Sequence, residues 1–349
     1  MVLANADAKA TVGVLANPAS GRDIRRLVAQ ASVFPTAEKA NMVQRICGAL
    51  GTLGIARVLM STDLGGISAA VLRATRNRRA SQSPWPDLEF CELDRFTETA
   101  EDTVTQVRRM IDAGARVIIC LGGDGTARAV ASACGDVPLL PLSTGTNNAF
   151  PQLREATVAG LAAGLVAAGV IDPATATQQT SVLEVRAGDR VELALVDVCV
   201  STATHIGSRA LWDPAALTEL YCTFAEPDGI GLSSVPGQLC PSPRTEPTGV
   251  VLRLCAPEVA RHVVHAPIAP GLVLPVGVRS WRPLRPGEEL PVSADHGVVA
   301  VDGEREIELR RGEPATVRLR ADGPRCVDVT RVLGIAAREG WLRDSQQHQ

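Results

Sequence analysis

A glycine-rich segment, Gly122-Gly123-Asp124-Gly125-Thr126, holds the residue types best suited to chemistry in this chain. An apolar run ends at Gly122, and a helical pattern of small residues follows Thr126. Glycines let a backbone approach a bulky anion, and the free N–H groups at the start of a helix suit phosphate. Asp124 would repel that phosphate unless a cation or a proton transfer intervenes. The pattern predicts metal-assisted phosphate chemistry, with a capped βα turn as the alternative.

Two more turns fall at corresponding places of the expected sheet. Asn17–Gly21 follows a strand predicted at Thr11–Ala16, and Thr144–Asn148 follows a strand predicted at Pro138–Leu142. Strands that alternate with helices form a parallel sheet, and ligands bind beyond the carboxyl ends of such strands. We therefore expect the three turns to converge on one edge. An ordinary turn and an Asx-type loop are the respective alternatives.

The first half of the chain alternates in this way throughout. Helices are expected at Asp23–Val33, Thr36–Leu53, Ile67–Arg76, Thr99–Ala113 and Ala156–Val170, and further strands at Arg57–Met60, Leu88–Leu93 and Val117–Leu121. The alternation predicts an α/β domain over residues 1–172, a doubly wound, Rossmann-like parallel sheet with helices on both faces.

The pattern changes after Asp172-Pro173. Short strands with Gly/Pro turns between them predict a β-rich sandwich domain over residues 173–328. These strands are expected at Ser181–Arg186, Val191–Val200, Val250–Cys255, Val263–Ala266, Gly297–Val301, Glu306–Arg310 and Thr316–Arg320. Ala215–Phe224 is expected to be a helical insert, and Pro236–Pro247 a long functional or mobile loop. Residues 329–349 are expected to form a helix and a tail that fold back on the first domain.

Composition argues against several classes of protein. The chain carries 35 basic and 38 acidic residues, a net charge of −3, and only 3% of its residues are aromatic. A nucleic-acid partner is therefore not expected. A membrane partner is not expected either, because there is no basic amphipathic helix and no run of about 18 apolar residues. We expect a cytoplasmic protein, since no export signal is evident and the nine cysteines are scattered without a CxxC pair.

Asp197 lies inside the apolar run Leu195–Val198, where an unpaired charge is expensive. The sequence favours two roles for Asp197 equally: contact with a substrate, or an ion pair with Arg186 or Arg209. Arg209 could itself reach an anionic acceptor, with an exposed position as the alternative.

Several motifs together resemble one superfamily of kinases. Asn17–Gly21 resembles the NPxSG segment of diacylglycerol and sphingosine kinases, and Gly122–Thr126 matches the GGDGT signature that these enzymes share with NAD kinases. Gly145–Phe150 resembles the lipid-kinase GTxNDF segment, with Ala149 in place of its aspartate, and residues 302–304 resemble the DGE motif. The mixture looks closest to the acetoin-catabolism protein X family, an NAD-kinase-like group.

This resemblance implies a two-domain kinase with the ATP phosphates on the first domain and the acceptor between the domains. The implied nucleotide-binding residues are Asn17, Ser20, Gly21, Gly122, Gly123, Gly125, Thr126, Gly145, Thr146 and Asn148. Asp124 would hold Mg²⁺ or accept the proton of the acceptor hydroxyl. Glu304 would be the second catalytic carboxylate, with Asp302 beside it at the metal. For Asp302-Gly303 a hairpin turn is the alternative.

The resemblance leaves the acceptor open. A stretch that starts at Asp228 is similar to the NAD-kinase DGxxxSTPTGS segment, so Asp228 joins Asp197 and Arg209 as a candidate for acceptor binding. The expected activity is ATP- and Mg²⁺-dependent phosphoryl transfer to a hydroxyl of a small metabolite, with NAD as an alternative acceptor. Ala149 motivates a second alternative, a non-catalytic nucleotide-binding regulator of a catabolic pathway. A dehydrogenase is excluded because no GxGxxG follows the first strand. The expected partner is a small-molecule substrate, and a homodimer is left open.

Overall fold

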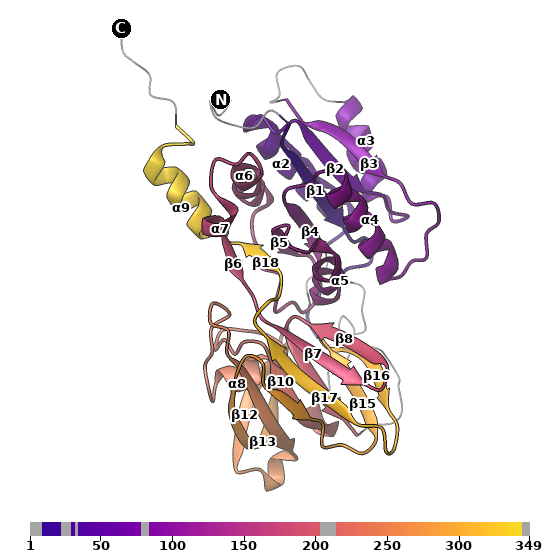
Figure 1. Ribbon diagram of the computed structural model, residues 1–349, viewed down its shortest axis with the longest axis vertical. Helices are drawn as coiled ribbons and strands as arrows, with labels where there is room; N and C mark the ends of the chain where they lie inside the picture. Colours follow the sequence, from indigo (N-terminus) through magenta and orange to yellow (C-terminus); the bar gives the residue numbers. More distant parts are fainter. Residues whose placement is uncertain (1–8, 22–28, 32–33, 78–83, 203–213, 344–349) are drawn as a thin grey trace.

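The computed structural model consists of an α/β domain and a β-rich domain, one above the other in Figure 1. It describes residues 9–21, 29–31, 34–77, 84–202 and 214–343. The helix expected at Asp23–Val33 falls mostly outside these residues.

The first domain is built around a seven-stranded sheet in the order β3-β2-β1-β4-β5-β18-β6. Its strands are β1 (Thr11–Ala16), β2 (Arg57–Ser61), β3 (Asp87–Cys91), β4 (Ile118–Gly122), β5 (Leu139–Ser143), β6 (Thr177–Gln179) and β18 (Arg325–Val327). All pairs are parallel except β18 with β6. Of the strands after residue 172, β6 and β18 extend the first sheet, so the β-rich domain is inserted between these two strands.

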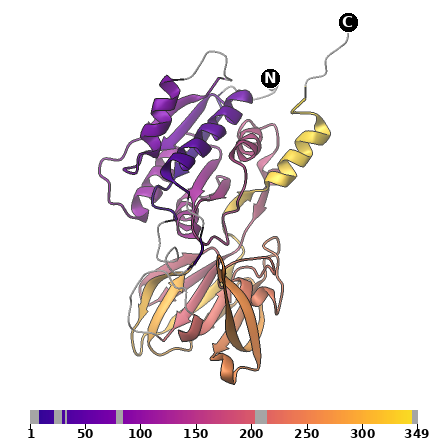
Figure 2. The same cartoon turned by 180° about the vertical axis from the view of Figure 1, so that it is seen from behind.

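Helices cover both faces of this sheet. They are α2 (Thr36–Thr52), α3 (Ile67–Arg76), α4 (Ala100–Asp112), α5 (Asp124–Cys134), α6 (Ala156–Ala167), the short α7 (Pro173–Ala176) and α9 (Val329–Glu339). Val12 and Val14 of β1 belong to the core cluster that also contains residues of α2, α3, α6 and α9, whereas Leu15 belongs to the cluster that contains residues of α4 and α5. Figures 1 and 2 both place α9 beside α6. This arrangement confirms the doubly wound α/β fold that the alternation predicted.

The second domain packs two antiparallel sheets face to face. One sheet has the order β12-β13-β11-β10-β9-β15-β16 and the other β14-β17-β7-β8. The strands are β7 (Val182–Ala187), β8 (Arg190–Ala194), β9 (Asp197–Ser201), β10 (Leu217–Cys222), β11 (Gly249–Cys255), β12 (His262–Ala269), β13 (Leu272–Leu284), β14 (Glu289–Pro291), β15 (Gly297–Val301), β16 (Glu304–Leu309) and β17 (Ala315–Arg320). Apolar side chains from both sheets, Val185 and Val200 among them, form the core between the sheets. The expected β-rich sandwich is confirmed.

The helix expected at Ala215–Phe224 is wrong, because most of this segment is the strand β10. It lies in the interior of its sheet, between β9 and β11. Leu220 packs on one side of the sheet and Tyr221 on the other. Short apolar stretches fit helical and extended periods almost equally, so pairing with neighbouring strands decides the outcome.

The single strand expected at Val191–Val200 is also wrong. The segment forms two strands, β8 and β9, which belong to different sheets. Leu195 and Val196 lie between the two strands and are buried. Their N–H groups both donate to Asp302, so this crossing between sheets contributes directly to the site described below.

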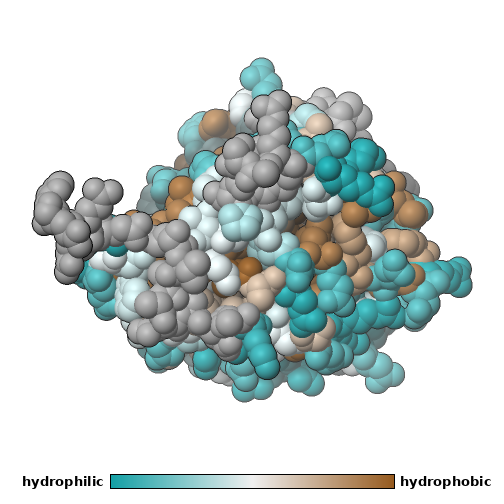
Figure 3. All heavy atoms as spheres, turned by 90° about the horizontal axis from the view of Figure 1, so that it is seen from above, coloured by the Kyte–Doolittle hydropathy of each residue, from teal (hydrophilic) through white to brown (hydrophobic). Residues whose placement is uncertain are grey.

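None of the helices in the described part of the chain is long and apolar enough to cross a membrane. Figure 3 looks down on the molecule from the α/β end and shows many hydrophilic residues, with hydrophobic residues in small groups between them.

The second domain also contains the four-residue helix α8 (Ser234–Gly237), which packs against β12 and β11.

Candidate active site

A cavity of about 620 Å³ lies where β1, β4 and β5 end, between the two domains. Most of the residues singled out in the sequence line it: Asn17, Ser20, Gly21, Gly123, Asp124, Gly125, Thr126, Gly145, Thr146, Asn148, Asp302 and Glu304. The three turns therefore converge as the parallel topology predicted.

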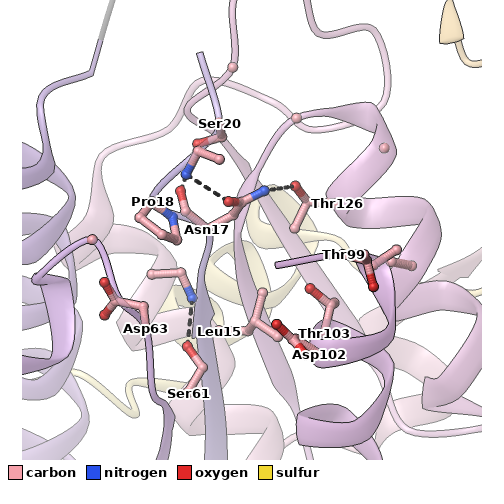
Figure 4. A pocket seen from close by; sticks show the side chains of 18 of the residues that line it. Leu15, Asn17, Pro18, Ser20, Ser61, Asp63, Thr99, Asp102, Thr103 and Thr126 are labelled. Carbon is pink, nitrogen blue, oxygen red and sulfur yellow. Dashed lines mark hydrogen bonds between the residues drawn. The ribbon is translucent and has the colours of Figure 1, made fainter. Parts of the chain in front are cut away.

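The first turn, 17–21, is held by its own polar groups and by its neighbours. The side-chain oxygen of Asn17 accepts from the N–H of Ala19 at 2.8 Å, and its Nδ2 donates to Oγ1 of Thr126, also at 2.8 Å (Figure 4). The hydroxyls of Ser20 and Thr144 share a hydrogen bond of 2.8 Å. Gly21 adopts a φ of +79°, which an L-residue rarely adopts. The first turn is thus tied to both of the others.

The second turn, 122–126, requires glycine at its first two positions because there is no room for a Cβ atom there. A Cβ built on Gly122 would lie 2.5 Å from the side chain of Thr126, and one on Gly123 would lie 2.9 Å from Oδ1 of Asn148. Thr126 accepts from Asn17, so the proton of its own hydroxyl remains to be donated to another acceptor. Gly122 itself is buried behind the turn and does not line the cavity; its carbonyl accepts from the N–H of Thr144.

The third turn, 144–150, is held by hydrogen bonds to residues of both domains. Nδ2 of Asn148 donates to Oγ of Ser143 at 2.6 Å, which directs this amide into the turn. Asn147 donates to the carbonyl of Ile268 at 2.9 Å in the second domain. A Cβ on Gly145 would lie 2.3 Å from Oδ1 of Asn148. Asn148 therefore stabilises this turn through its side-chain hydrogen bond, and it also lines the cavity.

Asp124 begins helix α5, and the third turn holds its carboxylate in place. The N–H of Phe150 donates to it at 2.9 Å, and the N–H of Ala149 lies 3.2 Å from both of its oxygens. Two positioned donors keep a carboxylate in one orientation. Asp124 is 9% exposed and lines the cavity.

Arg244 also holds the third turn; it lies in the connection 238–248 between α8 and β11. Its guanidinium donates to the carbonyls of Ala149 and Phe150 at 3.0 and 3.2 Å, and it forms an ion pair with Glu226. The ring of Phe224 lies 4.4 Å beneath it. Burial by itself would raise the pKa of Glu226, but the hydrogen bonds and charge of Arg244 outweigh burial and lower it. This loop therefore supports the site from outside the cavity.

Asp302 and Gly303 form the two-residue turn between β15 and β16, and both adopt positive φ values, +51° and +74°. These angles are typical of the type I′ turn that Asp-Gly favours. The side chain of Asp302 nevertheless lies at the site and accepts from the N–H groups of Leu195 and Val196 at 3.1 and 2.8 Å. The hairpin alternative is therefore confirmed, and Asp302 also lines the cavity.

Arg128 lies between the two carboxylates of the hairpin. Its guanidinium is 3.6 Å from Asp302 and 3.8 Å from Glu304. Burial raises the pKa of Asp302 to about 7; the charge of Asp124 adds to this rise, while Arg128 and the backbone donors oppose it. Glu304 is more open, with a side chain that is 36% exposed, and its carboxylate faces Gly125.

A second, much smaller cavity of about 20 Å³ adjoins the first, with room for about one water molecule. Asp124, Asn147, Asp197 and Asp302 line it. Asp197 is buried beneath the site, and the pair expected with Arg186 is not formed, because Arg186 instead pairs with Glu184 at 2.7 Å. Asp197 therefore shares this small cavity with Asp124 and Asp302, two of the acids that also line the main cavity.

The structure does not bring every predicted residue to the site. Asp228 is exposed on a turn and lines neither of these cavities. Arg209 lies outside the described residues. Sequence reasoning missed Lys39, Arg128 and Arg244. Arg128 had a signal, since it follows Asp124 by four residues and so shares its helix face.

The carboxylates of the cavity suit Mg²⁺ bound together with phosphate. Within the described residues, no group of three or more His, Cys, Asp or Glu side chains could hold a metal ion. Mg²⁺ in phosphate-handling sites typically takes one or two carboxylates and completes its shell with phosphate oxygens and water. Asp124 meets that need because it lies between the phosphate-type turns. Asp302 suits it less, because backbone donors already occupy its oxygens.

Comparisons with known proteins agree with this architecture. Residues 12–170 match the model of the ATP-NAD kinase N-terminal domain, and residues 181–322 match that of the acetoin catabolism protein X C-terminal domain. The structure of yeast NADH kinase complexed with NADH is similar in fold, with a TM-score of 0.52 at 14% identity over 98% of this chain and 90% of that one. At this identity the likeness concerns the fold alone.

One relative covers both domains. The acetoin catabolism protein X of Cupriavidus necator is 41% identical over 99% of this chain and 97% of that protein. This similarity spans the glycine turn, the hairpin carboxylates and the loop that carries Arg244. The chain therefore belongs to the acetoin catabolism protein X family.

Proposed function

We propose that this protein is a kinase that uses ATP and Mg²⁺ to phosphorylate a hydroxyl group of a small metabolite. The observation that carries the proposal is the convergence of three glycine-containing turns on one cavity with Asp124 on its wall. The volume of about 620 Å³ lies in the range of small-molecule sites. The NAD-kinase-like fold supports a phosphotransferase of this kind.

Phosphoryl transfer requires mainly positioning and neutralisation of charge, and the chain offers both. The N-terminus of α5 opens into the cavity next to the hydroxyls of Ser20 and Thr126. Helix N-termini and hydroxyl donors suit phosphate oxygens. We assign the polyphosphate to this end of the cavity and the acceptor to the end near the second domain.

The carboxylates have separate roles in this proposal. Asp124 holds Mg²⁺ or accepts the proton of the acceptor hydroxyl, and it is oriented for either role by the N–H groups of Ala149 and Phe150. The ion itself would neutralise charge on the transferred phosphoryl group. Glu304 faces the start of α5 across the cavity, with Arg128 beside it, and is the second carboxylate that can approach the acceptor.

The acceptor remains a small hydroxylated molecule of unassigned identity in this proposal. NAD belongs among the candidates because the yeast enzyme of similar fold was solved with NADH. A non-catalytic nucleotide-binding regulator is the alternative that Ala149 motivates, and the same experiment separates it. We place the protein in the cytoplasm, where its nine cysteines would stay reduced.

The test is transfer of labelled phosphate from γ-labelled ATP to a panel of polyols, hydroxy acids, hydroxyketones and NAD, with Mg²⁺ present. We expect transfer by the wild type and a loss of about 10²–10⁴-fold in Asp124→Asn. Asp136→Asn, at an exposed position just after α5, serves as the control and should keep its rate. ATP binding without transfer to any acceptor would favour the regulator. Absence of ATP binding would overturn the proposal.

A further inference from the structure

This chain almost completely avoids lysine. It contains 33 arginines but only two lysines, Lys9 and Lys39. Lys39 is 1% exposed, on the face of α2 that packs into the core with Met42 and Val43. Long charged side chains are almost never fully buried unless they are paired. A lysine in such a place therefore requires an explanation from its partners.

Those partners belong to the first turn of the candidate site. Nζ of Lys39 donates to the carbonyl oxygens of Asn17, Pro18 and Ser20 at 3.0, 3.2 and 2.8 Å. Three carbonyls from four successive residues thus converge on one ammonium. A compact ammonium has three rotatable donors that can meet such a cage, whereas the planar fork of arginine cannot. The geometry explains why lysine is used at this position in a chain that otherwise prefers arginine.

The ammonium lies behind the turn and does not itself line the cavity. The side chains of Asn17 and Ser20 form hydrogen bonds with Thr126 and Thr144 of the neighbouring turns. Lys39 consequently draws the backbone carbonyls to one side while the polar side chains of the turn meet the neighbouring turns. It also places a positive charge in a low-dielectric environment close to where anionic ligands would bind.

We propose that Lys39 is the positioning residue of the polyphosphate site: it shapes the turn 17–21 and attracts the phosphates through that turn without touching them. The inference rests on the proposed function, because it requires a polyphosphate in this cavity. A charge that acts in this way has a larger effect on ligands with more phosphates, so its loss should weaken ATP more than ADP and leave adenosine almost unchanged.

The rarity of lysine supplies a direct probe. Protein labelled with ¹³C at the lysine Cε carbon should give two signals, which the Lys39→Met spectrum assigns. We expect ATP to shift the Lys39 signal of the wild type, adenosine to leave it in place, and the Lys9 signal to serve as an internal control. An unmoved Lys39 signal at saturating ATP would overturn the inference. If Lys39→Met does not fold, the spectrum of Lys9→Arg, which changes an exposed lysine, assigns the two signals instead.

The second measurement is calorimetric titration of Lys39→Met with ATP, ADP and adenosine. We expect the Kd for ATP to rise at least about tenfold, the Kd for ADP to rise less, and that for adenosine to change less than about twofold. Arg45→Met is the matched control, because Arg45 lies on the same helix at an exposed position and pairs with Glu38. An equal loss for all three ligands would indicate a purely structural role and refute the inference. Failure of the wild type to bind ATP would instead refute the proposed function.

Discussion

The guanidinium of Arg244 donates to the carbonyl of Ala149 at 3.0 Å, on the residue whose N–H donates to the carboxylate of Asp124. One peptide turn thus connects a cation of the second domain to the central acid of the first. The orientation of Asp124 therefore depends on the position of the second domain, although the two residues that carry this dependence are 120 positions from each other in the chain.

Arg244→Ala should lower phosphoryl transfer by about tenfold or more and the free energy of unfolding by about 1–3 kcal/mol. The reason is that Glu226 loses its partner and two carbonyls lose a charged donor. Steady-state kinetics and urea unfolding measure the two effects. Arg190→Ala, at an exposed position of β8, is the control. A normal rate in Arg244→Ala would show that Asp124 does not depend on this turn.

Removing Arg128 should disturb both carboxylates of the hairpin. Arg128→Met removes the cation that opposes the rise in the pKa of Asp302 and that lies beside Glu304. We expect kcat to fall about tenfold and the acidic limb of the pH–rate profile to move to higher pH. Arg108→Met, exposed on α4, should change neither quantity. An unchanged profile would remove Arg128 from the electrostatics of the site.

Asp302 should make stability depend on pH in a defined direction. Because burial raises its pKa from 3.8 to about 7, its folded state binds a proton more tightly than its unfolded state does. The stabilisation that this tighter proton binding gives the folded state is therefore fully present below about pH 4. It is lost as the pH rises through about 7. In EDTA, the free energy of unfolding of the wild type should fall over this range relative to Asp302→Asn. Parallel curves for the two proteins would contradict this; Asp228→Asn controls for loss of an aspartate.

Gly21→Ala tests the close approach of the first and third turns. Gly21 has a φ of +79°, and a Cβ there would lie 3.1 Å from the carbonyl oxygen of Thr144. The substitution should cost about 1 kcal/mol of stability and weaken ATP binding about tenfold. Gly114→Ala, at a φ of +91° with open space around it, should cost similar stability but leave binding intact. Equal binding by both variants would show that the first turn does not contact the nucleotide.

Local patterns were sufficient to predict the framework of the site. A glycine-containing turn that follows a strand lies at the carboxyl edge of a parallel sheet, and the three strands with such turns, β1, β4 and β5, are neighbours here. The turns at Asn17, Gly122 and Gly145 therefore had to converge once the sheet was parallel. The Asp302-Gly303 dipeptide likewise specified its hairpin, because both residues tolerate positive φ.

Other parts of the structure depend on contacts between distant segments. The stretch around Tyr221 became a strand because β9 and β11 offered it hydrogen-bonding partners on both sides. Leu195 and Val196 cross between two sheets, which no local pattern of apolar residues distinguishes from one continuous strand. That crossing supplies the N–H donors of Asp302.

The amino-acid sequence by itself determined the order of most strands and helices, the glycine-containing turns that line the cavity, and the acid among them. Only the tertiary structure decided that Lys39 gathers the carbonyls of the first turn and that Arg244 supports Asp124 from the other domain. The physical reason is the range of the forces. Backbone preferences and hydrophobic periodicity act over a few neighbouring residues, whereas the partner of a buried charge is chosen by which segments the fold brings within hydrogen-bonding distance.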